Sequence, residues 1–235
     1  MRARMNDIND RPFFCSWSGG KDSCLALYRA IRQGGSPRCL FTMFAEDGRR
    51  SRSHGLSPDI IEAQARAMAI PSKIANASWD GYEKVFLKHL AELKEQGLAD
   101  GVFGDIDLEP HRIWVKRVCA EHAIVPHLPL WQTGRRNLLH EFIGAGFRAL
   151  IVVVDDKRLD QAFLGRQIDW QTIADLEAAG VDACGEEGEY HSVVIDGPLF
   201  SSPLQLRSGD IVSQEGYSFL EVGLEAKQRC KVRCK

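Results

Sequence analysis

Residues 18–23, with the sequence SGGKDS, constrain the fold more than any other part of the chain. They follow a short apolar segment, PFFCSW, which predicts a buried strand. They precede a segment in which Cys24, Leu27, Tyr28 and Ile31 have the spacing of one helical face. A glycine-rich turn between a strand and a helix presents backbone N–H groups to an anion, aided by the helix N-terminus. This order predicts an α/β domain with an anion site at residues 18–23, here called the glycine loop.

The composition of the glycine loop narrows the kind of anion site. Its sequence fits neither the Walker A pattern nor the GxGxxG pattern of dinucleotide-binding proteins. Lys21 supplies a positive charge, whereas Asp22 would repel a bare phosphate. Asp22 fits a site where a divalent cation accompanies phosphates, because Mg²⁺ is bound by carboxylate and phosphate oxygens together. The alternative is a plain glycine turn with a solvated Lys–Asp pair.

Strand-like and helical segments alternate through the first half of the chain. Strand-like segments occupy residues 38–45, 72–78 and 99–104, and helical patterns between them begin at Ser57 and Ser78. This alternation is typical of βαβ units and predicts a parallel sheet with helices on both faces.

The second half of the chain has a different pattern. Residues 125–131, VPHLPLW, contain two prolines, and we interpret them as a bridge between domains. Residues 190–200 and 204–216 predict strands joined by glycine turns. The second half therefore predicts a smaller α+β domain with antiparallel strands.

The composition limits the classes of function. A net charge of −2 over 235 residues gives no field that favours nucleic acid or a membrane surface. The longest apolar run, residues 149–154, is too short to span a bilayer, and residues 1–14 contain no apolar signal core. Seven scattered cysteines predict reduced thiols and a cytoplasmic protein. Cys230 and Cys234 supply at most half of a tetrahedral zinc site, which favours a basic tail over a metal or redox site.

The glycine loop, with its strand and helix, resembles the PP-loop of the ATP pyrophosphatase superfamily. In that superfamily, ATP is cut between its α and β phosphates, and the loop holds the departing pyrophosphate. Two further segments, GVFGDIDLEPHRIW at 101–114 and GEEGEYHSVVIDGPLF at 185–200, resemble marker segments of the diphthine–ammonia ligase family. The resemblance extends over about residues 13–200, and three separate motifs occur in the expected order.

The resemblance implies both an architecture and an activity. Its fold is α/β, a PP-loop (adenine nucleotide α-hydrolase-like) parallel sheet with helices on both faces and a smaller α+β C-terminal domain. Family members activate the carboxylate of diphthine, a modified histidine in elongation factor 2, as an acyl-adenylate, and ammonia then displaces AMP. The expected divisions are a frayed lead-in at 1–12, a PP-loop ATP-binding domain at 13–125, an acceptor-binding domain at 126–225 and a basic tail at 226–235.

The resemblance also implies substrates and partners. ATP and Mg²⁺ are the expected cofactors, with ammonia or an amine as the nitrogen donor. The acceptor is a carboxylate, on a modified protein residue or a small molecule. A homodimer is one option for the oligomeric state. Neither a membrane nor a nucleic acid is expected as a partner.

Site residues transfer from the family position by position. The implied phosphate and Mg²⁺ ligands lie in the glycine loop, and two residues after the fourth strand, Gly104 and Asp105, lie where parallel sheets place ligands. Asp22 and Asp105 are the expected metal ligands, although Asp105 has an alternative role as the N-terminal cap of the next helix. His54 is expected near the nucleotide. The implied nucleotide-binding residues are Ser18, Gly19, Gly20, Lys21, Asp22, Ser23, His54, Gly104 and Asp105.

Residues 185–189, GEEGE, are called the acidic turn here, and the resemblance implies that they face the acceptor. Clustered carboxylates suit two roles, holding a cationic substrate or taking a proton from ammonium. Glu186 and Glu189, with Lys21 and Asp22, are the expected catalytic residues. Glu187 is less favoured, because the family usually has glycine at its position. The alternative is a solvated, exposed turn, and Tyr190 could add a ring face for a quaternary amine.

The chain departs from the family pattern on the acceptor side. Residues 107–112 are DLEPHR where the archaeal and eukaryotic ligases have a serine and a glutamine–arginine stretch, and Glu109, His111 and Arg112 are alternative acceptor contacts. Two other functions fit a PP-loop protein. A tRNA-thiolating enzyme would need a catalytic cysteine, such as Cys184, and a basic RNA surface. A non-catalytic ATP-binding protein would need neither Lys21, Asp22 nor the acidic turn.

Overall fold

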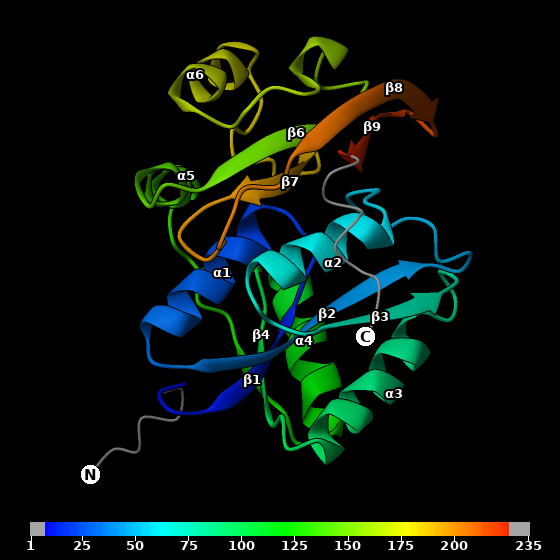
Figure 1. Ribbon diagram of the computed structural model, residues 1–235, viewed down its shortest axis with the longest axis vertical. Coiled ribbons are helices and arrows are strands. Elements are labelled where there is room, and N and C mark those ends of the chain that lie inside the picture. The colour runs from blue at the N-terminus through cyan, green and yellow to red at the C-terminus, as the bar shows by residue number, and fades with distance from the viewer. Residues whose placement is uncertain (1–7, 226–235) are drawn as a thin grey trace. The chain divides into compact units, whose positions relative to one another are not determined.

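The computed structural model describes residues 8–225, and these residues form two compact units (Figure 1). The first unit contains the described residues up to 18, residues 22–52 and residues 70–134. The second contains residues 19–21, 53–69 and the described residues from 135 onward. The middle of the glycine loop is therefore grouped with the C-terminal part of the chain.

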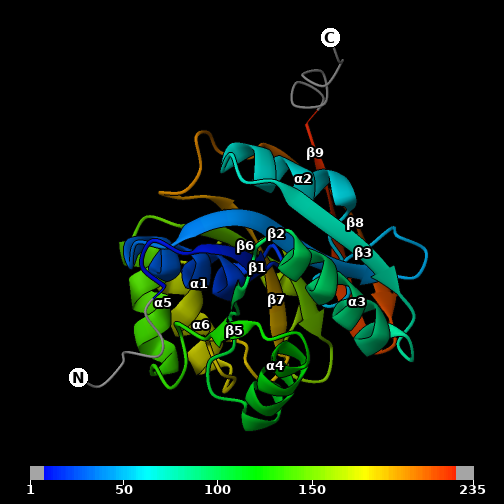
Figure 2. The same ribbon diagram turned by 90° about the horizontal axis from the view of Figure 1, so that it is seen from below.

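The first unit contains a five-stranded parallel sheet in the order β3-β2-β1-β4-β5. Strands β2 and β3 run side by side in it (Figure 2). The chain passes from β1 to β2 and β3 on one side of β1 and then returns to β4 and β5 on its other side, so the C-terminal ends of β1 and β4 lie at a topological switch point, where open α/β sheets bind ligands. The strands are β1 (Pro12–Ser16), β2 (Ser36–Ala45), β3 (Ser72–Ala77), β4 (Asp100–Val102) and β5 (Val125–His127).

Helices cover this sheet with apolar side chains. Helix α1 (Lys21–Arg32) buries Cys24, Leu25 and Leu27. Helices α3 (Tyr82–Glu95) and α4 (Glu109–Glu121) form one core with sheet residues. Right-handed crossovers place α1 on the opposite face from α3 and α4. The core side chains that α3 and α4 contribute are Phe86, Leu90, Leu93, Val115, Val118 and Cys119.

The second unit contains a four-stranded antiparallel sheet in the order β7-β6-β9-β8. Helix α2 belongs to this unit; it begins after Ser57 with Pro58 in its first turn, as predicted. The strands are β6 (Arg148–Asp155), β7 (Tyr190–Asp196), β8 (Leu206–Gln214) and β9 (Tyr217–Leu224), and the helices are α2 (Pro58–Ala67), α5 (Arg135–Gly144), α6 (Trp170–Ala178) and a 3₁₀ turn, η1 (Gln161–Phe163).

The predicted fold class is confirmed: a parallel α/β sheet and a smaller antiparallel α+β part. Two local expectations are wrong. Residues 125–127, interpreted as part of a bridge, form strand β5, and Pro126 is tolerated there because β5 is the edge strand. Ile8, expected in a frayed lead-in, is buried. The expected tail with Cys230 and Cys234 lies outside the described residues. None of the helices among residues 8–225 has the length and apolar character needed to cross a membrane.

Candidate functional site

The glycine loop connects the end of β1 to the start of α1. Gly19 has φ +83°, a conformation that L side chains rarely adopt, so the turn requires glycine there. The hydroxyl of Ser23 closes the loop, because it accepts the Ser18 backbone N–H at 3.3 Å and lies 3.0 Å from the Ser18 hydroxyl. The loop therefore ends at the N-terminus of a twelve-residue helix, which favours anions.

Gln64 of α2 fixes the first glycine of the loop. Its Nε2 donates to the carbonyl of Gly19 at 2.9 Å and to the carbonyl of Val194 in β7 at 2.8 Å. The backbone N–H of Val194 donates to the same Gly19 carbonyl at 2.9 Å. Gln64 is fully buried, and an amide nitrogen has two protons, so both of its donors are used. Gly19 is thus attached to β7 directly and through one side chain.

His54 and Ser192 contact the next two residues of the loop. A Cβ atom at Gly20 would lie 2.3 Å from His54 Cε1, so the position has room only for glycine. The backbone N–H of Lys21 donates to Ser192 Oγ at 3.2 Å. His54 Nδ1 lies 2.7 Å from the Ser192 carbonyl, and Nδ1 carries the proton because a carbonyl can only accept. The structure places His54 against the loop, and its contact with nucleotide stays a prediction.

The His191 ring packs against the His54 ring, with centroids 4.8 Å apart and planes tilted by 44°. Burial, with the charges of His54 and Lys21 as smaller causes, lowers the pKa of His191 from 6.5 to about 3. His191 is therefore neutral at physiological pH. A neutral imidazole adds no positive charge beside Lys21.

Lys21 carries its charge in a buried position. The residue is 5% exposed, and its Nζ lies 5.7 Å from the centroid of the Tyr190 ring. Tyr190 is itself buried, and its hydroxyl donates to the Ala183 carbonyl at 2.8 Å. The Lys21 ammonium already lies against the Tyr190 ring, and contact of this ring with a quaternary amine stays a prediction.

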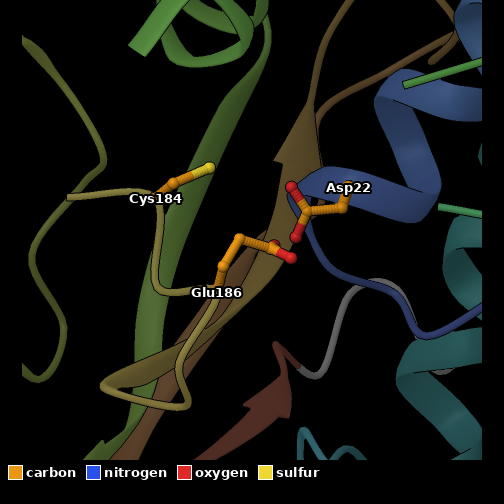
Figure 3. Close-up of side chains that lie close together, drawn as sticks. All are labelled: Asp22, Cys184 and Glu186. Carbon is orange, nitrogen blue, oxygen red and sulfur yellow. The ribbon is translucent and has the colours of Figure 1, made fainter. Parts of the chain in front are cut away.

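The chain after β4 approaches the first turn of α1. Asp22 lies on that turn (Figure 3). A Cβ atom at Gly104 would lie 2.9 Å from the Ser23 nitrogen and 3.0 Å from the Asp22 carbonyl carbon, so only glycine permits this approach. Asp105, the next residue, lies 3.5 Å from His111 Nδ1. Asp105 is not a helix cap, because α4 begins at residue 109 and Leu108 is its N-cap.

Metal binding by Asp22 and Asp105 stays a prediction. Both residues follow neighbouring strands, β1 and β4, at their C-terminal ends. Among residues 8–225, Asp105 belongs to no group of three or more His, Cys, Asp or Glu side chains close enough to share one ion. Solvent and phosphate oxygens would have to complete its coordination.

The acidic turn precedes β7, and its glutamates differ in burial. Glu187 is exposed, and Glu186 is half-buried on the loop that also carries Cys184 (Figure 3). Glu189 has only 4% of its side chain exposed, and its Oε2 accepts the Glu187 backbone N–H at 3.1 Å. Arg158 lies 3.7 Å from the other Glu189 oxygen. The alternative of a solvated, exposed turn does not hold for Glu189, whose burial is compensated by a charged neighbour and a backbone N–H.

Asp182 organises the start of this loop. Its two oxygens accept the backbone N–H groups of Cys184 at 3.0 Å and Glu186 at 3.1 Å. Arg135 donates to the same carboxylate at 2.8 Å. An Asp that bonds the backbone two residues on is a recognised turn signal, so Asp182 could have been found from the sequence.

Sequence reasoning also missed Gln64, Ser192 and Arg158. Gln64 gave a usable signal, because it lies among Ile60, Ile61, Ala63 and Ala65 on the buried side of α2. A polar residue on an apolar helix face must find a partner inside the fold. Ser192 and Arg158 gave no comparable local signal.

The cysteines next to the glycine loop are inert. Burial raises the pKa of Cys15 and Cys24 well above 9, and both side chains are fully buried. A thiol with a raised pKa supplies almost no thiolate at neutral pH. These residues therefore do not suit sulfur transfer.

Comparison with known proteins gives matches over most of the chain. The model of the diphthamide synthase N-terminal domain matches residues 14–126, and the model of the C-terminal domain matches residues 135–228. The human diphthine–ammonia ligase is 29% identical over 243 residues, which covers 89% of this chain and 91% of the human protein. The bovine diphthine–ammonia ligase is also 29% identical, covering 87% of this chain and 86% of its own length.

Two more distant matches differ in coverage. The diphthine–ammonia ligase of Schizosaccharomyces pombe is 25% identical over 83% of this chain, but the match covers only 36% of that longer protein. A solved structure described as a predicted subunit of tRNA methyltransferase from Methanocaldococcus jannaschii has a TM-score of 0.42 at 17% identity. It covers 80% of this chain and 99% of its own.

Proposed function

Since this chain belongs to the diphthamide synthase family, we propose that it is an ATP-dependent ligase that joins ammonia to a carboxylate as an amide. The main support for this proposal is the position of the glycine loop, which follows the central strand β1 and leads into helix α1. Such a position suits polyphosphate, because backbone N–H groups and the helix dipole act together. Consistent with the PP-loop motif, ATP would be cut between its α and β phosphates, with AMP carried on the acceptor.

Lys21 is the proposed electrostatic partner of the phosphates. Its side chain is buried, where a charge acts more strongly than in water. Charge develops on the leaving pyrophosphate as the α–β bond breaks, and a fixed cation stabilises that charge without reorganisation. Ser18 and Ser23 would contribute hydroxyl contacts, and His54 would contact the nucleotide beside Gly20.

Mg²⁺ is proposed as the ion that accompanies ATP. Asp22 and Asp105 would hold it, since both supply the carboxylate oxygens that Mg²⁺ prefers and both follow the C-terminal ends of adjacent strands. Bound there, the ion would neutralise part of the phosphate charge. Gly104 supports the pair, because it lets the chain after β4 come close to the turn that carries Asp22.

The acidic turn is proposed to serve the acceptor step. Glu186 is half-buried, so it can reach substrate, and a carboxylate there could take the proton that ammonium must lose before attack. Glu189 was the favoured glutamate from the sequence, and we retain it as part of the acceptor site. Its burial and its bond to the Glu187 backbone favour a positioning role, in which it holds the turn in shape.

The acceptor is proposed to be a carboxylate of the diphthine type, as the names of the relatives indicate. The residues that follow β4 depart from the family pattern, and Arg112 there is already engaged. It donates to Glu109 at 2.6 Å and lies 4.7 Å from the centroid of the Trp131 ring. We place the enzyme in the cytoplasm, since the five cysteines of the described residues are free thiols.

Product analysis tests this function. With ATP, ammonium and a diphthine-containing acceptor, the expected products are AMP and pyrophosphate in equal amounts, which ³¹P NMR resolves. ADP with phosphate would refute the proposed bond cleavage. A tRNA-thiolating activity is not favoured, because the family models and the curated relatives that match the chain are diphthamide synthases and diphthine–ammonia ligases.

A further inference from the structure

We infer that Gln64 and Ser192 are positioning residues that hold Gly19–Lys21 against strand β7. Neither residue touches substrate in this assignment; both act through the backbone of the glycine loop. The inference deepens the proposed function and rests on it for its catalytic part. Its structural part concerns only the loop, α2 and β7, which belong to one compact unit.

Hydrogen bonds join Gln64 and three backbone groups into one network, the carbonyl of Gly19 in the loop and the N–H and carbonyl of Val194 in β7. The carbonyl of Gly19 receives two hydrogen bonds, from Gln64 Nε2 and from the Val194 N–H, at 2.9 Å each. The carbonyl of Val194 receives the second proton of Gln64 Nε2 at 2.8 Å. The Gln64 side chain thus joins the glycine loop, 45 residues before it, to strand β7, 130 residues after it.

Ser192 attaches the loop at a second point, two residues later. Its hydroxyl accepts the backbone N–H of Lys21, and its carbonyl accepts the proton on His54 Nδ1. Both Ser192 and Gln64 are almost completely excluded from water, with 2% and 0% exposure. Buried hydrogen bonds of this kind keep their geometry, because no water competes for the donors.

Packing alone does not explain these polar side chains. Gln64 lies on the apolar face of α2, where leucine or methionine would bury as much surface without a desolvation cost. The space around the loop is also filled. A Cβ atom at Gly19 would lie 2.6 Å from Leu56 and 2.9 Å from Gln64 Oε1. The amide is explained by the two carbonyls that it binds.

This attachment gives β7 two functions. Its first residue, Tyr190, directly follows the acidic turn, and its third and fifth residues, Ser192 and Val194, hold the glycine loop. One strand therefore sets the positions of the proposed phosphate site and the proposed acceptor segment. A misplacement of about 1 Å can lower a rate by about 10²-fold, so loosening the attachment should act on kcat more than on ATP binding.

The experiment compares Gln64→Met with Ile60→Val. Methionine nearly conserves volume and removes both donors, whereas Ile60 lies on the same buried face of α2 and has an apolar side chain that cannot donate a hydrogen bond to the loop. We expect Gln64→Met to lower kcat for AMP formation by about 10- to 100-fold, with KM for ATP within about threefold. We expect Ile60→Val to lower the melting temperature comparably and leave kcat unchanged. Equal kcat in the two variants would overturn the inference.

Ser192 supplies a readout that does not depend on activity. Ser192→Ala should speed hydrogen exchange at the Lys21 amide by at least about tenfold, because that N–H loses its acceptor. Ser192→Thr retains the hydroxyl and should restore both slow exchange and kcat. Unchanged exchange in Ser192→Ala would overturn the inference by itself. If the wild type formed no AMP, the proposed function would fail, while amide exchange would still decide whether β7 holds the loop.

Discussion

The glycine loop and the acidic turn are held in place by different kinds of interaction. Gly19 and Lys21 are fixed by neutral hydrogen bonds from buried groups, chiefly those of Gln64 and Ser192. The acidic turn is fixed by charged groups, of which Arg158 is 43% exposed and Glu187 is 59% exposed. Salt therefore acts weakly on the loop and more strongly on the turn.

This difference separates two requirements of the proposed reaction. A phosphate site must present the same N–H geometry in each turnover, and buried neutral bonds provide that stiffness. Partly exposed ion pairs contribute little energy each, so the turn can adjust when an acceptor enters. The comparison predicts that loop variants change adenylation and that turn variants change transfer.

The largest expected effect is on transfer. Glu186→Gln should lower the rate of amide formation by about 10²- to 10⁴-fold and leave ATP-dependent adenylation intact, because a lost proton acceptor typically costs that much. Rapid-quench measurement of adenylate and amide separates the two steps. Glu187→Gln is the matched control, with the same charge change at the exposed neighbouring position. If both variants transferred normally, Glu186 would have no role as the proton acceptor.

The next effect concerns the two charges of the glycine loop. Lys21→Met should lower adenylation by about 10²- to 10³-fold and weaken ATP binding with and without Mg²⁺, since it removes a buried cation beside the phosphates. Asp22→Asn should weaken binding only when Mg²⁺ is present. Calorimetric titration of ATP with Mg²⁺ and with EDTA tests both variants. Equal losses for Asp22→Asn under the two conditions would argue against a metal at Asp22.

A smaller effect tests the ion pairs of the turn. Arg158→Met removes a donor to the Glu187 carbonyl at 2.9 Å and the charge 3.7 Å from Glu189. Transfer should fall by about two- to fivefold, and added salt should reduce the wild-type rate toward that of the variant. Arg136→Met, at an exposed position paired with Glu177, should have no effect. If the wild-type transfer rate did not depend on salt, the acidic turn would not differ from the glycine loop in being held by ion pairs.

A last effect is on stability and not on catalysis, and it depends on pH. His191 has a pKa of about 3 in the folded chain and about 6.5 when unfolded, so the unfolded chain binds one more proton between these values. Stability therefore falls as the pH falls through this window, by about 1.4 kcal/mol per pH unit from this group. His191→Asn should flatten that slope in urea unfolding, and an unchanged slope in this variant would contradict the assignment to His191.

The fold could be predicted from sequence where the signals were local. A few adjacent residues were enough to predict the glycine loop, the alternating strands and helices, and the later strands joined by glycine turns. Strand β5 was missed because Pro126 argues against a strand unless that strand lies at an edge. Edge position is a property of the whole sheet, and no local pattern reveals it.

The site was less predictable, because its supports come from distant segments. Gln64 lies 45 residues from Gly19, and Arg158 lies 29 residues from Glu187. One sequence cannot pair such positions. The burial of Glu189 was missed for the same reason, because the sequence of the acidic turn is typical of an exposed loop and does not show that Arg158 lies beside it.

Isotope incorporation tests the central claim most directly. The enzyme is given ¹⁵N-ammonium, ATP and a diphthine-containing acceptor, and mass spectrometry of the acceptor is read alongside quantitation of nucleotides. The account predicts one ¹⁵N atom in a new amide for each AMP and pyrophosphate released. AMP release without nitrogen incorporation, or incorporation accompanied by ADP, would contradict it.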